Sequence, residues 1–267
     1  MTDHPFGSLS VHRDTDKGRE IFVTFDSTGV LTAFNGHVDL GTGIQTALAQ
    51  IVAEEAELPL SRVQVILGDT ACTPDQGPTI ASETIQVAAV PLRLAAAQLR
   101  GELAARGARR LNAPEDGVTL RDGMVHWKDT SVAFEALLEG REEMLRLDPA
   151  TPLKSPADYT IVGHKTPRQD LPAKVIGQHT FIHDVDVAGM VHGHVLRPPY
   201  AGRDSGPFIG TSLLGWNEDA VRDMPGFIAV VRKGDFLGVV ADRADQAQAI
   251  AEALPVRWRT PPSAPDL

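Results

Sequence analysis

Cysteine is nearly missing from this sequence, which has a single one, Cys72, in 267 residues. One thiol excludes an intramolecular disulfide framework, and it excludes an iron–sulfur cluster held by this chain alone because such clusters need several thiolates. Basic residues are outnumbered, with 25 Lys and Arg against 35 Asp and Glu and a formal net charge of −10. This balance argues against a nucleic-acid partner, which would need clustered Lys and Arg.

Long apolar runs are also absent, so the sequence predicts no membrane span, which takes about 18 apolar residues or more. The first residues show no export signal, and we expect the cytoplasm as the compartment. The histidine pairs His179 with His183 and His192 with His194 lack a carboxylate or cysteine at a recognisable metal spacing. We therefore expect no metal held by protein ligands.

Apolar periodicity predicts a mixed α/β fold. Ile44, Leu48 and Val52 repeat at helical spacing and would share one buried face of a helix. Strands and helices alternate along the first half in this order: strands at 21–25 and 30–34, a helix at 44–57, a strand at 62–67, a helix at about 90–105 and a hairpin at 118–127.

Charges and prolines dominate the stretch 141–157, which is predicted to be a linker between a domain at 1–140 and a domain at 158–267. The acidic pairs Glu54-Glu55 and Glu142-Glu143 are expected on solvated faces. The second domain is predicted to contain strand-like runs at 174–185, 190–196, 227–232 and 236–240 and a helix at 245–254.

The most informative segment, residues 35–50, reads as a strand, a Gly-x-Gly turn and a helix. Gly41 and Gly43 would let the backbone approach a ligand closely, and the helix start would offer unpaired N–H groups with a partial positive charge. An anion or polar-ring site is therefore reasonable, although a short glycine motif more often marks an ordinary turn before a helix.

The motifs that follow in the sequence favour a binding site over an ordinary turn. Together with Leu67-Gly68-Asp69-Thr70 and the run Thr73 to Ser82, this segment resembles the first molybdopterin-binding region of the xanthine dehydrogenase and aldehyde oxidase family, in its nicotinate and isoquinoline dehydrogenase branch. Residues 170–177 and 189–199 resemble that family's α/β hammerhead domain. The resemblance implies a partial molybdopterin-binding region at 1–140 and a hammerhead domain at 158–267.

Two loops would hold the cofactor according to this resemblance. Gly41, Thr42 and Gly43 match the loop beside the pterin, and because many relatives have glutamine in the middle, the shorter Thr42 is expected to act through its backbone. A second loop, which matches the family's pterin-holding loop, contributes Thr79, Ala81 and Ser82. Ser82 also suits a helix cap, and the two uses are compatible.

The resemblance further implies a component of a molybdenum hydroxylase that oxidises an N-heteroaromatic compound or an aldehyde with oxygen from water. The expected cofactor is molybdenum on molybdopterin, in the cytosine dinucleotide form, shared with a second molybdopterin-region chain. Other expected partners are a small 2Fe-2S subunit and a cytochrome-type electron acceptor.

No catalytic residue is expected in this chain, because the family's catalytic glutamate belongs to a second molybdopterin region that the sequence does not contain. The chain alone is thus expected to be inactive, with the apolar face around Ile44 to Val52 left partly uncovered as a partner surface. The alternative is a non-catalytic binding or assembly module that keeps the same scaffold.

Overall fold

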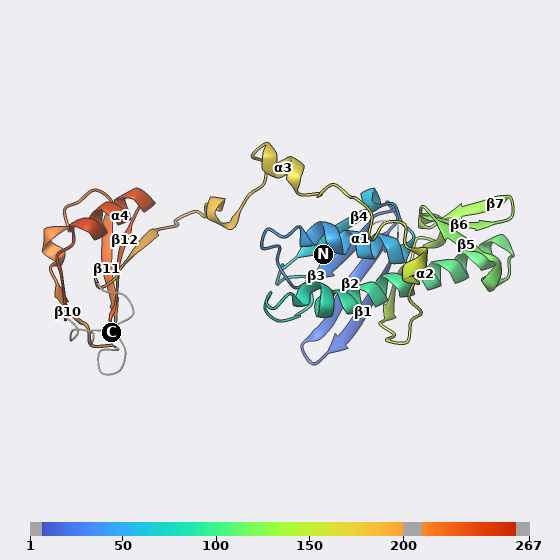
Figure 1. The fold of residues 1–267 in the computed structure, drawn as a ribbon, viewed down its shortest axis with the longest axis horizontal. Coiled ribbons are helices and arrows are strands. Elements are labelled where there is room, and N and C mark those ends of the chain that lie inside the picture. The colour runs from blue at the N-terminus through green and yellow to red at the C-terminus, as the bar shows by residue number, and fades with distance from the viewer. Residues whose placement is uncertain (1–6, 200–209, 260–267) are drawn as a thin grey trace, which may run out of the picture. The chain divides into compact units, whose positions relative to one another are not determined.

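The computed structural model describes residues 7–199 and 210–259, drawn as a ribbon in Figure 1. The chain divides into two compact units, residues 1–179 and 180–267, and each has its own buried apolar core. Strands and helices occur in both units, which confirms the mixed α/β fold predicted from the sequence.

A five-stranded sheet in the order β4-β3-β2-β1-β8 forms the centre of the first unit. Strands β1, β2 and β3 pair antiparallel, whereas β4 runs parallel to β3 and β8 runs parallel to β1. Leu31 and Ala33 show the period-two burial that fixes the register, since both are fully buried. The strands are β1 (Ser8–Thr15), β2 (Gly18–Asp26), β3 (Leu31–Asn35), β4 (Val63–Leu67) and β8 (Glu142–Arg146).

Two helices, α1 (Ile44–Ala56) and α2 (Ala89–Leu111), pack against each other and cover one face of this sheet (Figure 1). Leu48 and Val52 of α1 are fully buried, as the helical period predicts, so this face is core and not an uncovered partner surface. A π-helical turn, η2 (Thr84–Ala88), leads into α2. It lies just before Pro91, which has no N–H to continue the ordinary helical ladder.

A small antiparallel sheet packs beside α2 and contains the predicted hairpin: β5 (Thr119–Arg121), β6 (Met124–Trp127) and β7 (Thr130–Ala133). Gly107 of α2 permits this packing, because a Cβ there would lie 2.6 Å from the side chain of Val125. Phe134 follows β7 and meets Phe25 edge to face, with ring centroids 6.1 Å apart. The small sheet therefore shares the core of the first unit.

The stretch 141–157 is not a linker in the structure. Residues 142–146 form β8 at the edge of the central sheet, and Lys154 places its Nζ 2.6 Å from Glu54 Oε1 on α1. Residues 154–170, called the strap below, then run along α1 and include the short helix η5 (Pro156–Asp158). The charges that suggested a linker are typical of an edge strand, and the division between units falls after residue 179.

The second unit contains a three-stranded antiparallel sheet in the order β11-β12-β9, a strand pair β10-β13, and helix α4 packed on the sheet. These elements agree with the strands predicted at 190–196, 227–232 and 236–240 and the helix at 245–254. Their bounds are β9 (His192–Leu196), β10 (Leu213–Trp216), β11 (Phe227–Lys233), β12 (Phe236–Ala241), α4 (Ala244–Ala253) and β13 (Val256–Trp258).

The prediction of a strand at 174–185 is wrong. The chain instead forms a short helix, α3 (Leu171–Val175), with Pro172 in its first turn, and a 3-10 turn, η6 (Ile182–Asp184). Four more 3-10 turns connect the described elements: η1 (Leu60–Arg62), η3 (Glu115–Gly117), η4 (Glu135–Leu137) and η8 (Glu218–Ala220). No helix within residues 7–199 and 210–259 is long and apolar enough to cross a membrane.

Candidate functional site

The two sequence-predicted loops lie side by side. The loop between β3 and α1 meets the loop before η2 where the Val38 N–H donates to Thr79 Oγ1 at 3.0 Å. Between them is a hollow of about 340 Å³, called the loop cavity below. Its lining residues are Val38, Leu40, Thr42, Ile44, Thr79, Ile80, Ala81, Ser82, Thr84 and Ile85.

The walls of the loop cavity are apolar, with hydroxyl groups among them. Leu40 and Ile80 are 71% and 56% exposed, so both side chains are open to contact with a ligand. Thr42 and Ser82 are exposed and contribute hydroxyls. Apolar surfaces with a few placed polar groups suit a flat heterocycle that carries a polar edge.

Ala81 and Ser82 form the unusual backbone of this site, with φ of 50° and 60°. Residues other than glycine adopt this left-handed region at a cost, and such strain concentrates at ligand sites. Within the described part of the chain, their N–H groups make no hydrogen bond. The cap expected for Ser82 is not formed, since η2 begins after Glu83 without a side-chain cap.

Asp39 occupies the N-terminus of α1, where the sequence suggested an anion site. Its Oδ1 accepts hydrogen bonds from the N–H groups of Gly41 (2.8 Å) and Gly43 (3.2 Å), and its Oδ2 accepts one from Gln45 (3.4 Å). Partial burial raises the pKa of Asp39. The hydrogen bonds from these N–H groups and the charge of Arg168 together lower it by a larger amount, so the net shift of the pKa is downward. The chain's own carboxylate therefore takes the place of an external anion.

A buried network of polar side chains supports both loops. His37 is 1% exposed; its Nδ1 lies 2.8 Å from Thr84 Oγ1, and its Nε2 lies 3.2 Å from the carbonyl oxygen of Gln76. Because a carbonyl only accepts, Nε2 must carry a proton. Gln76 Oε1 accepts from the Gly36 N–H at 2.8 Å, and its Nε2 donates to the carbonyl of Ala88 at 2.8 Å. These bonds tie the end of β3 to the start of α2.

Arg168 extends from the strap to the loop Gly41-Thr42-Gly43, called the glycine loop below. Its Nη1 donates to the carbonyl of Gly41 at 3.1 Å, and its Nε and Nη2 donate to the Asp170 carboxylate at 3.0 and 2.6 Å. The side chain also packs on Gly43, where a Cβ would lie 3.0 Å from Nε. The guanidinium of Arg168 and the ammonium of Lys174 hold the pKa of Asp170 well below its usual range.

Four of the six sequence-predicted site residues, Thr42, Thr79, Ala81 and Ser82, line the loop cavity. Gly41 and Gly43 do not line it and instead bind Asp39 and Arg168. Sequence reasoning missed the supporting side chains of His37, Asp39, Gln76 and Arg168. The Asp-x-Gly spacing, typical of a turn closed by an Asp side chain, could have indicated Asp39. No local pattern indicates Arg168, which lies 127 residues from Gly41.

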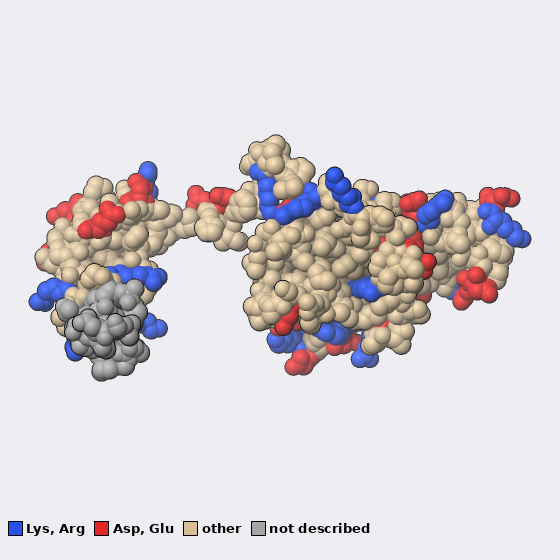
Figure 2. Space-filling view, in the orientation of Figure 1, with Lys and Arg blue, Asp and Glu red and all other residues tan. Residues whose placement is uncertain are grey.

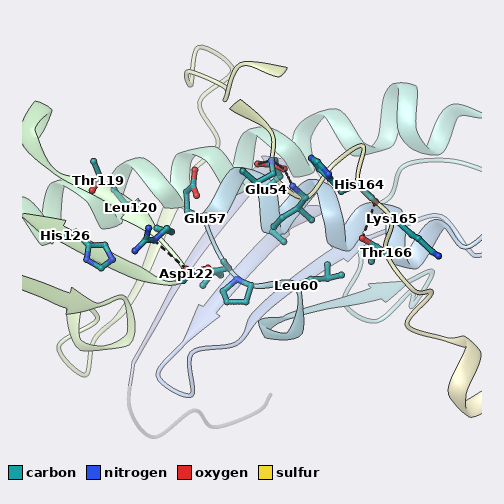
Figure 3. Close-up of a pocket in the computed structure, with 16 residues that line it drawn as sticks. Glu54, Glu57, Leu60, Thr119, Leu120, Asp122, His126, His164, Lys165 and Thr166 are labelled. Atoms are coloured by element: carbon teal, nitrogen blue, oxygen red, sulfur yellow. Dashed lines mark hydrogen bonds and ion pairs between the residues drawn. The ribbon is translucent and has the colours of Figure 1, made fainter. Parts of the chain in front are cut away.

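Glu54 and Glu55 are buried, contrary to the expectation of a solvated face, with 2% and 1% exposure. Glu55 pairs with Arg93 and Arg100 of α2, and Glu54 pairs with Lys154 of the strap. Beside Glu54 lies a second hollow of about 870 Å³, bordered by the end of α1, the β5–β6 hairpin and the strap (Figure 3). None of the sequence-predicted site residues lines it.

Cys72 is exposed in the loop after β4. Partial burial and the neighbouring Asp69 carboxylate raise the pKa of its thiol, so a reactive thiolate is not favoured. Among the residues that the structure describes, no three or more His, Cys, Asp or Glu side chains gather in a way that could hold a metal ion.

Comparison with known proteins identifies relatives of this chain. A family model described as a molybdopterin cofactor-binding domain matches residues 4–193. The chain is 47% identical over 248 residues to a subunit of the nicotinate dehydrogenase of Pseudomonas putida, and the match covers 92% of this chain and 21% of that protein. It is 26% identical over 284 residues to the beta chain of isoquinoline 1-oxidoreductase from Brevundimonas diminuta, covering 91% of this chain and 35% of that protein.

Among solved structures, quinoline 2-oxidoreductase from Pseudomonas putida 86 matches 44% of this chain and 15% of its own, with 26% identity and a TM-score of 0.38. The chain thus spans about a fifth to a third of the length of the two curated relatives.

Proposed function

The chain belongs to the molybdopterin cofactor-binding domain family, and from this premise we propose that the loop cavity binds part of the pterin of a molybdenum cofactor. One observation carries the proposal: two loops far apart in sequence meet at a cavity with apolar walls, and two strained residues there leave their N–H groups unpaired within the described chain. A ligand that accepts hydrogen bonds along one edge would use these donors.

Each wall of the cavity has a distinct part in this proposal. Leu40 and Ile80 would contact the flat face of the ring system, while the N–H groups of Ala81 and Ser82 would donate to its polar edge. Thr79 holds Val38 and so sets the spacing of the two loops. Once bound, the cofactor supplies the oxidation chemistry, and the residues named here bind and orient it.

We propose that the whole protein is a component of a molybdenum hydroxylase acting on an N-heteroaromatic compound or an aldehyde. Support comes from the relatives, whose names give nicotinate and isoquinoline as substrates and describe both proteins as subunits. The cytosine dinucleotide form of the cofactor, a second molybdopterin region, a small 2Fe-2S subunit and a cytochrome-type acceptor belong to the same proposal. The second unit, which begins at residue 180, is proposed to be the hammerhead domain.

Cofactor content tests the proposal without depending on turnover. The protein, expressed with its partner subunits in a molybdopterin-competent host, should contain pterin and molybdenum. Thr42→Trp should fill the loop cavity from an exposed position and lower pterin content several-fold, whereas Thr119→Trp, exposed on β5, should leave it unchanged. Equal pterin content in both variants would remove the loop cavity from the binding site. A complex that never contains pterin would favour the non-catalytic assembly module.

A further inference from the structure

Three polar side chains of α1 hold the strap along its length. Thr46, Gln50 and Glu54 are spaced four residues apart, which places them on one face of the helix. All three bind strap residues, in antiparallel order along the helix. Three polar side chains on this face of α1 therefore bind one segment of the same chain.

Glu54 makes the most extensive of these contacts. Its Oε2 accepts hydrogen bonds from three successive N–H groups, those of Thr160 (3.0 Å), Ile161 (2.6 Å) and Val162 (2.9 Å). Its Oε1 accepts from Lys154 Nζ at 2.6 Å. In Figure 3 Glu54 lies close to the strap, which carries the labelled residues His164, Lys165 and Thr166. A buried carboxylate with this many charge-assisted bonds fixes the strap rigidly at one end.

Gln50 and Thr46 continue the contact toward the start of α1. Gln50 Nε2 donates to the carbonyl of Ile161 at 3.1 Å and to Thr166 Oγ1 at 3.0 Å. Thr46 Oγ1 accepts from the N–H of Gln169 at 2.9 Å. The strap is therefore held at successive turns until it arrives at the N-terminus of α1.

At that end the strap places Arg168 beside the glycine loop. Gly41 and Thr42 are exposed, and Asp39 binds the loop through the N–H groups of Gly41 and Gly43. Arg168 binds the same loop through the carbonyl of Gly41 and by contact with Gly43. The loop is thus clamped between a carboxylate and a guanidinium that belong to different segments.

We propose that the strap is a positioning device for the cofactor-binding loop: Glu54 anchors it, and Arg168 is the positioning residue that keeps Gly41-Thr42-Gly43 in its binding conformation. This inference rests on the proposed function of the loop cavity. A loop that spends less time in its binding conformation binds its ligand more weakly in the same proportion. Loss of Arg168 should therefore weaken cofactor binding although Arg168 does not line the loop cavity.

Hydrogen exchange of the full chain tests the clamp in the absence of cofactor. Arg168→Ala should raise the exchange rate of the amides of Gly41, Gly43 and Gln45 by roughly tenfold or more, because a charge-assisted hydrogen bond that closes the loop is lost. Arg168→Lys keeps the charge beside Asp170 without the planar guanidinium fork, and should recover part of the protection. The matched control is Arg243→Ala, which removes an exposed arginine from the second unit.

Cofactor content provides the second measurement. In the complex with its partner subunits, Arg168→Ala should lower pterin content and Arg168→Lys should restore part of it. Unchanged exchange at Gly41 to Gln45 in a folded Arg168→Ala protein overturns the clamp, as does a uniform rise across the whole first unit, which would indicate only global destabilisation. A wild-type complex without pterin defeats the proposed function instead, and the exchange result then still decides whether the strap clamps the loop.

Discussion

Gly43 combines two constraints that can be separated by substitution. Its φ of 78° disfavours any side chain, and a Cβ would also press on Arg168. Gly140 has a similar φ of 69° but nothing within 4 Å of an added Cβ. We expect Gly140→Ala to lower the free energy of unfolding by about 1–2 kcal/mol from backbone strain alone, and Gly43→Ala to lower it further. Urea unfolding of the two variants measures the difference. Equal losses in the free energy of unfolding would mean that the Arg168 side chain can move away from the added Cβ without an energetic cost.

Glu54 should make the stability of the first unit sensitive to acid. Burial raises the pKa of Glu54, but the bonds from Lys154 and from the N–H groups of Val162 and Ile161 lower it more, so the folded pKa lies below the unfolded one. The contribution of Glu54 to the free energy of unfolding is then fully present above the unfolded pKa, about 4.3, and is lost as the pH falls through the lower folded pKa.

Glu54→Gln tests this linkage. It should lower the free energy of unfolding by about 1–3 kcal/mol near neutral pH, with the deficit shrinking as acid protonates Glu54 in the wild type. Denaturant unfolding as a function of pH gives both numbers. Glu218→Gln, which breaks an exposed pair with Arg222, should change little at any pH. A deficit for Glu54→Gln that stays constant down to the lowest pH would contradict the linkage.

Individual site residues differ in how far they could be predicted. Resemblance to a family predicted both loops, and the structure places Thr42, Thr79, Ala81 and Ser82 around one cavity. The left-handed backbone of Ala81 and Ser82 could not be predicted, because neither residue type favours it. It follows from tertiary contacts, which a reading of local sequence does not include.

The segment between α3 and β9, residues 176–191, should be the first to be cleaved by proteases. It contains only the 3-10 turn η6, and nearly all of its residues are exposed. Chymotrypsin should therefore cut after Phe181, which is 51% exposed, and release a stable first unit. Trypsin should spare Arg146, because that residue lies in β8. Mass spectrometry of the fragments checks both sites; early cleavage within 141–157 would contradict the pairing of β8 with β1.

Elements with a strong period were predicted well, whereas weakly patterned strands were not. Helix α1 and the β5–β6 hairpin follow from spacing and turn residues. The sequence does not predict strand β1, because Leu9 and Val11 are its only large apolar residues, and it predicts a linker in place of β8, because β8 carries Glu142, Glu143 and Arg146. Edge strands tolerate such charges, and their identity depends on a partner that lies far away in sequence.

At the scale of the whole molecule, exposed apolar side chains gather around the loop cavity and the start of α2. Ile85, Val87 and Val90 are 42%, 58% and 49% exposed, beside Leu40 and Ile80 of the cavity. Figure 2 shows the surface over α1 and α2 as largely uncharged on the face it draws. Surfaces of this kind on a soluble protein usually mark a partner contact.

We therefore expect the isolated chain to self-associate as its concentration rises. Val87→Lys should reduce the association, whereas Val231→Lys, 45% exposed on β11 of the second unit, should not. Sedimentation velocity over a wide concentration range measures both effects. A monomer at every concentration would count against this surface as a contact.

The parallel pairing of β1 with β8 also has a consequence for biosynthesis. Residues 8–12 of β1 leave the ribosome about 130 residues before their partners at 142–146, which is roughly 7–25 seconds at about 5–20 residues per second. During that interval β2 can pair with one side of β1, but the other side presents free backbone groups to any neighbouring chain. Until residue 146 emerges, this side of β1 can therefore pair with another chain, which favours aggregation of the nascent first unit.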